Sequence, residues 1–440
     1  MSLNFSSPDN HGPPAVLRAR IVVPASHPPI EDGAVVVSAN RIVSVGRWRD
    51  VPRAVRSQVT DLGEQALLPG LVNAHCHLDY TGMAGQISPT RKFTDWLKLI
   101  TTNKGGWGYS EFAQSWLDGA RMLLRTGTTT VGDIEMVPEL LPEAWTSTPL
   151  RVFSFLEMTG VKSRRPPAEI IREALDKIAS LPAGHSRIGL SPHAPYSTTP
   201  ELLRLAADAA RRHNLRFVTH VAESDQEFDM FMHGRGGMFN WLARGGRDMS
   251  DCGLGSPVQH LERQHALSEH LLAVHVNYLA PGDALLLAKH KVHVVHCPRS
   301  HAYFKHRRFP LEELALAGVN LCLGTDSLAS VHQAGKQTAE LNLFAEMREL
   351  AGANPAVPPD IILQMATVNG ARALGLKGQI GELSPGAFAD LIAIPFAGKT
   401  AQIGEAIVHH QGGVAASMID GHWAVAPQET ARNRETLAPA

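Results

Sequence analysis

Four apolar runs in this chain end in side chains that bind metal ions. The first run, residues 68–74, leads into His75, Cys76 and His77. Alternate residues of a strand point to the same side, so His75 and His77 can offer two imidazoles to one cation while Cys76 faces away. The three later runs each end in a further potential ligand: His220, His275 and Asp326. Histidine and aspartate are donors in hydrolytic metal centres, where the cation lowers the pKa of a water molecule.

The repeated position of these residues at strand ends separates them from ordinary core histidines. A single His-x-His pair occurs often by chance, and an isolated buried histidine usually serves as a hydrogen-bonded core residue. Five potential ligands at the ends of four strand-like runs predict one shared site instead.

The composition excludes some functions. The chain has 440 residues, enough for one large domain and a smaller one. Its formal net charge is -1 at pH 7 and no long run of one sign appears, so we expect neither nucleic acid nor a membrane surface as a partner. No apolar stretch approaches the roughly 20 residues that span a bilayer.

Cysteine usage and the first residues indicate a cytoplasmic protein. The cysteines are scattered, without a C-x-x-C pair, which argues against a disulfide framework: Cys76, Cys252, Cys297 and Cys322. The opening segment, MSLNFSSPDNHGPP, lacks the basic stretch and apolar core of a signal peptide. We therefore expect a cytoplasmic location.

The pattern of apolar residues divides the chain into three parts. Residues 1–68 show short strands and turns, and residues 376–440 return to this pattern before a loose polar tail. We expect the two ends to build one small β-sandwich domain. Its predicted strands include 16–23, 33–37, 41–45, 387–394 and 423–425. Between them, residues 69–375 alternate strand-like runs with helical patterns, which predicts parallel β/α units.

Eight strand-like runs in the middle part predict a (β/α)8 TIM-like barrel, an α/β fold. These runs cover 68–77, 128–134, 151–157, 187–191, 216–220, 271–276, 291–296 and 320–324, with helical patterns at 93–102, 110–125, 200–212 and 311–316. A doubly wound sheet is the alternative, but the glycine-rich segment 234–237 does not follow a strand as a dinucleotide fingerprint requires. Barrel active sites lie at the carboxyl ends of the strands, where the five potential ligands are predicted.

The motifs around these residues resemble those of the amidohydrolase superfamily. They are LPGLVNAHCHLDYTGMAG (68–85), SPHAPYS (191–197), THVAES (219–224), HCPRSH (296–301) and LGTDSLAS (323–330). The segment GELSPGAFADLIAI (381–394) is similar to the returning β segment of that superfamily. As a set, the motifs resemble the branch that includes adenosylhomocysteine, guanine and aminodeoxyfutalosine deaminases and the triazine hydrolases.

The resemblance implies one divalent metal ion with four protein ligands: His75, His77, His220 and Asp326. Binuclear members carry a bridging carboxylated Lys at the end of the fourth strand, where residues 190–193 of this chain read Leu-Ser-Pro-His. A mononuclear site is therefore expected. Nitrogen and oxygen donors suit zinc, with iron or manganese as alternatives.

The resemblance also implies catalytic roles for Glu223, His275 and Asp326. Asp326 accepts a proton from water, and Glu223, in a His-x-x-Glu pattern after His220, donates a proton to the ring nitrogen beside the attacked carbon. His275 orients the water or stabilises the new oxygen. Without the family pattern, Glu223 would be interpreted as a solvated loop carboxylate.

Four residues are predicted to contact the substrate. His193 is similar to a residue that nucleoside deaminases of this branch use near the ribose, a buried structural histidine being the alternative. HCPRSH places Arg299 and His301 where many relatives read Asn-Pro-x-Ser-Asn, and it resembles the aminodeoxyfutalosine deaminases of menaquinone biosynthesis. Arg299 is expected to pair with the carboxylate of that substrate. Trp96, in the long loop 80–109, either lines the pocket or packs a helix onto the barrel rim.

Together these features predict a hydrolytic deaminase of a 6-aminopurine nucleoside that releases ammonia, with aminodeoxyfutalosine as the leading substrate. The alternatives are deamination of adenosylhomocysteine, methylthioadenosine or guanine, dechlorination of a triazine, and a metal-binding barrel without turnover. Members of this branch are often dimers, so a homodimer is expected.

Overall fold

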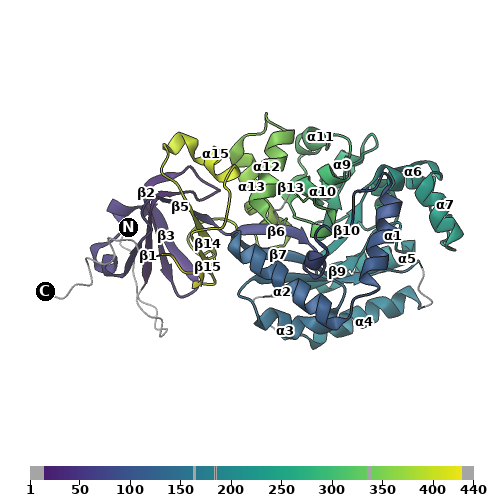
Figure 1. Ribbon diagram of the computed structural model, residues 1–440, viewed down its shortest axis with the longest axis horizontal. Coiled ribbons are helices and arrows are strands. Elements are labelled where there is room, and N and C mark those ends of the chain that lie inside the picture. Colours follow the sequence, from purple (N-terminus) through teal and green to yellow (C-terminus); the bar gives the residue numbers. More distant parts are fainter. Residues whose placement is uncertain (1–13, 162–164, 183, 185, 334–338, 429–440) are drawn as a thin grey trace.

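The computed structural model describes residues 14–161, 165–182, 184, 186–333 and 339–428. The opening segment and nearly all of the predicted polar tail lie outside the described residues. The chain folds into a barrel at one end of the molecule and a separate sheet at the other (Figure 1).

The predicted (β/α)8 barrel is confirmed. Its strands are hydrogen-bonded in the order β13-β12-β11-β10-β9-β8-β7-β6, and all neighbouring pairs are parallel. The strands are β6 (Leu71–Cys76), β7 (Thr128–Glu135), β8 (Arg151–Met158), β9 (Arg187–Pro192), β10 (Phe217–Val221), β11 (Leu271–His275), β12 (His293–His296) and β13 (Asn320–Leu323). Each of them overlaps one of the predicted strand-like runs.

Helices follow the strands and cover the outside of the barrel (Figure 1). They are α1 (Phe93–Lys104), α2 (Tyr109–Arg125), α3 (Leu141–Thr146), α4 (Pro167–Ser180), α5 (Pro200–His213), α6 (Asp225–His233), α7 (Gly237–Arg244), α8 (Pro257–Arg263), α9 (Asp283–Lys289), α10 (Pro298–Tyr303), α11 (Leu311–Leu316), α12 (Leu343–Ala353), α13 (Pro359–Met365) and α14 (Val368–Ala373). Local sequence explains their ends. The Thr199 hydroxyl accepts a hydrogen bond from the Leu202 N–H at 3.1 Å to begin α5, and Asn214 ends it with a left-handed φ of 51°.

A second sheet is built from both ends of the chain, as predicted. Its strand order is β16-β15-β14-β5-β1-β2-β3, with β4 paired to β1. The strands are β1 (Ala15–Val22), β2 (Ile30–Ser38), β3 (Arg41–Arg47), β4 (Val59–Asp61), β5 (Gln65–Pro69), β14 (Leu391–Pro395), β15 (Ala416–Ile419) and β16 (His422–Val425), and α15 (Ile403–Val408) follows β14. The division of the chain at residues 68 and 375 stays a prediction.

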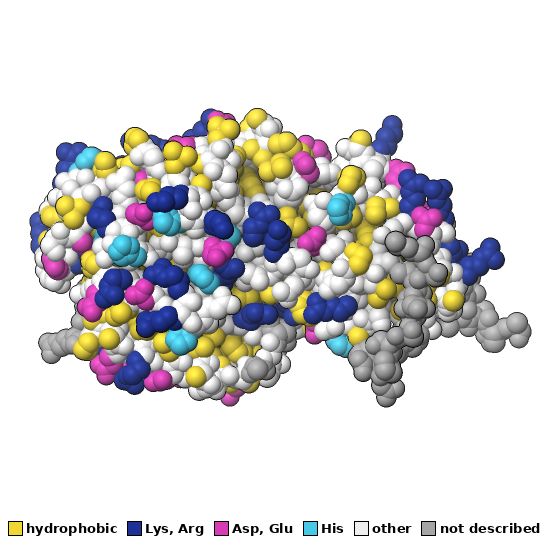
Figure 2. All heavy atoms as spheres, turned by 180° about the vertical axis from the view of Figure 1, so that it is seen from behind, with side chains coloured by type: hydrophobic (Ala, Val, Ile, Leu, Met, Phe, Trp, Pro, Cys, Tyr) yellow, Lys and Arg dark blue, Asp and Glu magenta, His cyan; other side chains and the backbone are white. Residues whose placement is uncertain are grey.

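The surface carries charges of both signs. On the face shown in Figure 2, basic and acidic side chains are interspersed among apolar ones. Within the described ranges, no helix is both long enough and apolar enough to cross a bilayer.

The barrel closes where the segment after β13 meets β6. The backbone N–H groups of Thr325 and Asp326 both donate to the His75 carbonyl, at 3.0 and 3.2 Å. The Asn73 side chain donates to the Thr325 hydroxyl at 2.8 Å and accepts from the Thr325 N–H at 3.1 Å. A Cβ at Gly324 would lie 2.7 Å from the His75 carbonyl oxygen, so this approach needs glycine. Closure therefore brings the first and last candidate ligands together.

A buried ion pair joins the amino-terminal end of the barrel to the second sheet. Arg151, the first residue of β8, has Nε 2.6 Å from Asp390 Oδ2 and Nη2 2.7 Å from Asp420 Oδ1. The side chains of Arg151 and Asp390 are only 4% and 1% exposed. Because Asp390 precedes β14 and Asp420 follows β15, one guanidinium links the barrel to the strands from the end of the chain.

We predict that Arg151→Ala destabilises the protein strongly, because it leaves Asp390 buried without its counter-charge. Loss of one partner of a buried pair costs about 3–5 kcal/mol. The thermal unfolding midpoint of the variant should fall by several degrees. Arg172→Ala is the control, because that arginine pairs on the surface of α4 and is 61% exposed. Equal midpoints for the two variants would contradict this assignment.

Candidate metal centre and active site

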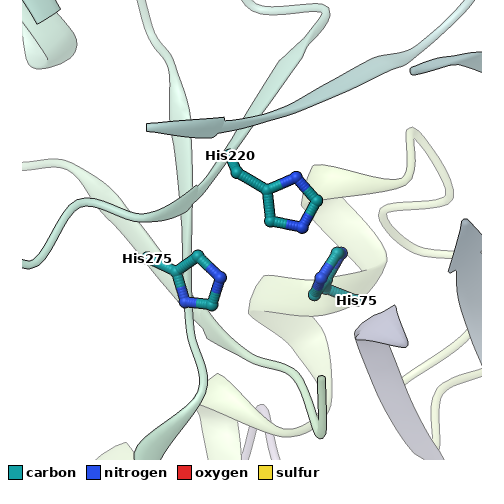
Figure 3. A group of neighbouring side chains, drawn as sticks. All are labelled: His75, His220 and His275. Atoms are coloured by element: carbon teal, nitrogen blue, oxygen red, sulfur yellow. The ribbon is translucent and has the colours of Figure 1, made fainter. Parts of the chain in front are cut away.

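Three histidines from three strand ends converge inside the carboxyl end of the barrel (Figure 3). His75 comes from β6, His220 from β10 and His275 from β11. The ring centroids of His75 and His220 are 4.9 Å apart, and those of His220 and His275 are 5.4 Å apart. All three side chains are buried. The structure thus brings together three histidines that are spread over 200 residues of the sequence.

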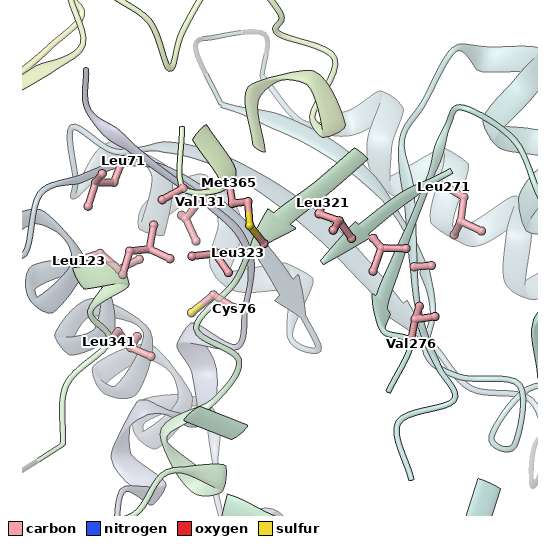
Figure 4. Packing of buried hydrophobic residues seen from close by; sticks show 14 of the residues in the cluster. Leu71, Cys76, Leu123, Val131, Leu271, Val276, Leu321, Leu323, Leu341 and Met365 are labelled. Carbon is pink, nitrogen blue, oxygen red and sulfur yellow. The ribbon is translucent and has the colours of Figure 1, made fainter. Parts of the chain in front are cut away.

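An irregularity in β6 aims His75 at the site. The pairing of β6 with β7 shifts register between Asn73 and Cys76, and Cys76 packs into the apolar layer with Val131 and Leu323 (Figure 4). Val72 and Ala74 belong to a different cluster, which fills the barrel interior. Strict alternation from Ala74 would send His75 outward, so the local shift re-aims its side chain.

His77 and Asp326 complete the group. His77 Nε2 lies 3.4 Å from His220 Nε2. Asp326 Oδ1 lies 3.8 Å from His75 Nε2 and 3.7 Å from His77 Nε2. One nitrogen or oxygen from each of His75, His77 and Asp326 lies within 4.8 Å of the others. The four residues predicted as metal ligands are therefore neighbours in space.

The donor atoms fit a metal ion. Both ring nitrogens of His75 are buried without a hydrogen-bond partner among the described residues. His220 Nδ1 lies 2.7 Å from the His193 carbonyl, which can only accept, so this nitrogen carries the hydrogen and Nε2 presents a lone pair. Burial lowers the pKa of both His77 and His220 well below the usual value, which keeps them neutral and able to coordinate.

Asp326 is held in its ionised form by its surroundings. Its Oδ2 accepts hydrogen bonds from the Ser300 hydroxyl at 2.6 Å and the Ser330 hydroxyl at 3.0 Å. Burial opposes ionisation, but the neighbouring imidazoles hold the pKa of Asp326 well below its usual range. The two serines fix one oxygen of the carboxylate, so the other faces His75 and His77.

Glu223 faces His275 across the site. Glu223 Oε1 lies 3.5 Å from His275 Nε2, and both side chains are buried. Burial raises the pKa of Glu223 well above its usual value, and the charges of Asp326 and Glu227 raise it further. Burial lowers the pKa of His275 to about 3. The raised pKa favours the protonated form of Glu223, and the lowered pKa favours the neutral form of His275.

Two residues outside the predicted set fix the loop that carries Glu223. The Glu227 carboxylate accepts the backbone N–H of Ala222 at 3.1 Å and of Glu223 at 2.9 Å. The Asn277 side chain, just after β11, donates to the Glu223 carbonyl at 2.9 Å. A second Glu four positions after Glu223 was visible in the sequence, but its role depends on the loop that folds back onto it.

His275 and Asp326 share an unusual backbone conformation. Their φ angles are 72° and 53°, in the left-handed region that non-glycine residues seldom occupy. Such strain costs of order 1–3 kcal/mol per residue and persists where the surrounding structure enforces it. Both side chains are turned into the site by this conformation.

A cavity of about 270 Å³ opens beside this group. His77, His220, Glu223 and Asp326 form one side of it. The remaining wall includes aromatic and apolar side chains from β6–α1, β9 and α7: Tyr80, Trp96, Leu97, Ile100, Tyr196, Trp241 and Leu242. A flat heteroaromatic ring fits such a lining, because aromatic walls offer stacking surfaces and polar groups are available for hydrogen bonds.

The structure places the predicted substrate contacts in two locations. His193 and Trp96 line the cavity. Trp96 lies on α1 and fulfils both predicted roles. Its side chain lines the cavity, and together with Phe93 and Ile100 it packs the helix in a buried apolar cluster. Arg299 and His301 are not among the lining residues. Arg299 Nε lies 3.4 Å from the buried Glu346, and the His301 ring packs between His296 and His306. Their predicted contact with substrate has no support in this geometry.

The polar residues of the cavity that were missed include Tyr80, Lys104 and Glu157. Glu157 lies at the end of a correctly predicted strand, so the strand-end rule that selected the ligands also selects it. The Tyr80 ring stacks on His77 with centroids 5.3 Å apart. Lys104 carries no comparable signal, because it reaches the cavity only through the way α1 folds over the barrel mouth.

Comparison with known proteins agrees with the family resemblance that the sequence motifs indicated. The sequence pattern of the amidohydrolase family matches residues 66–424. A 5-methylthioadenosine/S-adenosylhomocysteine deaminase from Syntrophobacter fumaroxidans is 32% identical over 378 residues, which cover 83% of this chain and 80% of that protein. The fold is similar to an adenosine deaminase from Xanthomonas campestris with bound zinc, with 25% identity, a TM-score of 0.77 and coverage of 93% and 92% of the two chains.

A third similarity concerns the fold alone. Helicobacter pylori aminofutalosine deaminase, solved with methylthio-coformycin, gives a TM-score of 0.82 at 21% identity and covers 93% of this chain and 100% of its own.

We predict that one zinc ion per chain binds at this group. Loading metal-free protein should raise the thermal unfolding midpoint, because a ligand at 1,000 times its Kd stabilises by about 4 kcal/mol. His75→Ala should lose both the bound zinc, measured by elemental analysis, and the rise in midpoint.

The matched control is His293→Ala, which removes a buried histidine at the amino-terminal end of β12. It should retain one zinc per chain. Full zinc content in His75→Ala would contradict the assignment of this ligand.

Proposed function

Because this chain belongs to the amidohydrolase family of metal-dependent hydrolases, we propose that it is a hydrolytic deaminase of a 6-aminopurine nucleoside. The observation that carries the proposal is the position of the buried Glu223 carboxyl, which lies 3.5 Å from His275 and lines the same cavity as His77, His220 and Asp326. Burial raises the pKa of Glu223, which favours the protonated form. Deamination needs a proton donor at that position, because the ring nitrogen gains a proton when water adds to the adjacent carbon.

A divalent metal ion held by His75, His77, His220 and Asp326 supplies acidification of a water molecule at neutral pH. Side chains of the protein carry out the proton transfers and stabilise the developing charge. Ionised Asp326 accepts a proton from the water through Oδ1, because Ser300 and Ser330 occupy Oδ2. Glu223 donates its proton to the ring nitrogen, and His275 stabilises the oxygen that adds to the ring. Asp326 then passes the proton taken from the water to the amino group, the carbon–nitrogen bond breaks to release ammonia, and the new hydroxyl returns a proton to Glu223 as the carbonyl forms.

Zinc is the metal that we propose. Three imidazoles and one carboxylate suit zinc, although iron and manganese accept similar donors. The similar Xanthomonas campestris structure contains zinc, which supports this choice. Residues 190–193, at the end of β9, contain no lysine to bridge a second ion, so we propose a mononuclear centre.

Two observations bear on the nucleoside. The preference for aminodeoxyfutalosine depended on Arg299, whose guanidinium lies on Glu346 instead of at the cavity. The curated relatives at 28–32% identity are methylthioadenosine/adenosylhomocysteine deaminases. We therefore propose an adenine nucleoside with a substituted 5′ position, and we rank adenosylhomocysteine and methylthioadenosine above aminodeoxyfutalosine.

The first prediction is that the zinc-loaded protein releases ammonia from adenine nucleosides. The panel contains adenosine, methylthioadenosine, adenosylhomocysteine, aminodeoxyfutalosine, guanine and a chlorotriazine, and the readout is kcat/KM for ammonia or chloride. Turnover of the substituted adenosines should exceed that of guanine and the triazine. Chloride release without ammonia release would replace the deaminase proposal by dechlorination, and silence across the panel would favour a metal-binding barrel without turnover.

The second prediction concerns Glu223. Glu223→Gln keeps the side-chain shape but removes the transferable proton, so kcat should fall by about 10²- to 10⁴-fold. Zinc content and unfolding midpoint should stay close to wild type. Glu201→Gln, on the exposed face of α5, is the control and should retain full activity. A Glu223→Gln variant with a near wild-type rate would rule out this role.

A further inference from the structure

The cavity contains an ammonium and a carboxylate that do not pair with each other. Lys104 ends α1 and Glu157 lies near the end of β8, and both line the cavity. No ion pair within 4.0 Å joins them, and in the described part of the chain neither has an oppositely charged partner within that distance. Lys104 Nζ instead lies 3.1 Å from the Tyr80 hydroxyl and 3.1 Å from Met136 Sδ.

Tyr80 sets the position of Lys104 relative to the metal centre. The Tyr80 ring is stacked on the His77 ring, with an interplanar angle of 2°, and Lys104 Nζ lies 5.7 Å from the Tyr80 ring centroid. The ammonium therefore lies beside the hydroxyl of a ring that stacks on a proposed metal ligand. Lys104 and Glu157 line the same cavity as Asp326 and Glu223, so a purine bound with its amino-bearing carbon at Asp326 and Glu223 can direct its N9 substituent to Lys104 and Glu157.

The surroundings make two unpaired charges costly. Leu97, Ile100, Val161 and Trp241 line the same cavity, and an apolar lining weakens solvation of charged groups. Burial raises the pKa of Glu157, and the nearby Lys104 opposes that rise, so the ammonium favours the ionised form of Glu157 without direct contact. A ligand that carries both opposite charges would pair with both groups at once.

We propose that Lys104 and Glu157 select a nucleoside whose 5′ substituent is a zwitterionic amino acid, as in adenosylhomocysteine. Lys104 binds the carboxylate of the amino acid and Glu157 binds its ammonium group. The inference rests on the proposed function, because that function places the purine at the metal centre. A neutral 5′ group, as in methylthioadenosine, leaves both charges unpaired, and a benzoate as in aminodeoxyfutalosine pairs with Lys104 alone.

The test is the ratio of kcat/KM for adenosylhomocysteine to kcat/KM for methylthioadenosine. The two nucleosides share the purine, the ribose and the 5′ sulfur, so the ratio isolates the amino-acid tail. The wild-type ratio should exceed one. Lys104→Met and Glu157→Gln should each lower it by about 10- to 100-fold, the size expected for one charge-assisted hydrogen bond. Lys92→Met, an exposed lysine immediately before α1, is the control and should leave the ratio unchanged.

The outcomes separate this inference from the proposed function. If both substrates are deaminated and both variants lower the two rates equally, Lys104 and Glu157 do not bind the amino-acid part of adenosylhomocysteine. In that case the inference fails, while the deaminase proposal stands. A wild-type preference for methylthioadenosine would also overturn the inference and leave the deaminase proposal intact. Ammonia release from none of the nucleosides, with zinc bound, overturns both proposals. Aminodeoxyfutalosine adds one check, because Lys104→Met should slow its turnover relative to methylthioadenosine and Glu157→Gln should not.

Discussion

The hydrogen bonds that close the barrel are the interaction on which the site depends. Thr325 and Asp326 donate their backbone N–H groups to the carbonyl of His75, so one peptide group of β6 receives the segment that follows β13. That contact fixes the position of the Asp326 carboxylate relative to His75 and His77. It also requires glycine at position 324, where any Cβ would strike the same carbonyl. The grouping of potential metal ligands from both ends of a long sequence interval is thus a consequence of closing the sheet on itself.

Much of this arrangement could be predicted from the sequence, because the barrel obeys simple periodic rules. Eight apolar runs gave eight strands, and the rule that polar groups at strand ends face the barrel mouth identified His220, His275 and Asp326. Period-two alternation also grouped His75 with His77, but it could not foresee the register shift in β6 that makes the grouping possible. Short strands tolerate such irregularities, and single-strand patterns do not record them.

The predicted substrate contacts of Arg299 and His301 lack support where side chains beyond the strands decide the outcome. Arg299 looked like a substrate ligand from its charge and motif, yet Glu346 lies 47 positions further along on α12 and takes the guanidinium. No role was predicted from the sequence for Lys104, which ends α1. Whether a long cationic side chain reaches a cavity or a buried carboxylate depends on how α1, α10 and α12 pack, and local sequence does not encode that packing.

The second sheet has a consequence for the order in which the chain is made. Its central strand β5 pairs with β1 from the start of the chain and with β14 from the end, and Pro69 lies opposite Leu391. At about 5–20 residues per second, ribosomes need on the order of tens of seconds to make the intervening barrel. Throughout that interval β5 has an unpaired edge beside apolar residues that await their partners. Strand β5 is therefore made before the barrel but completes its pairing only after it, and the nascent chain must keep the open edge of β5 from pairing with other strands until the barrel has been synthesised.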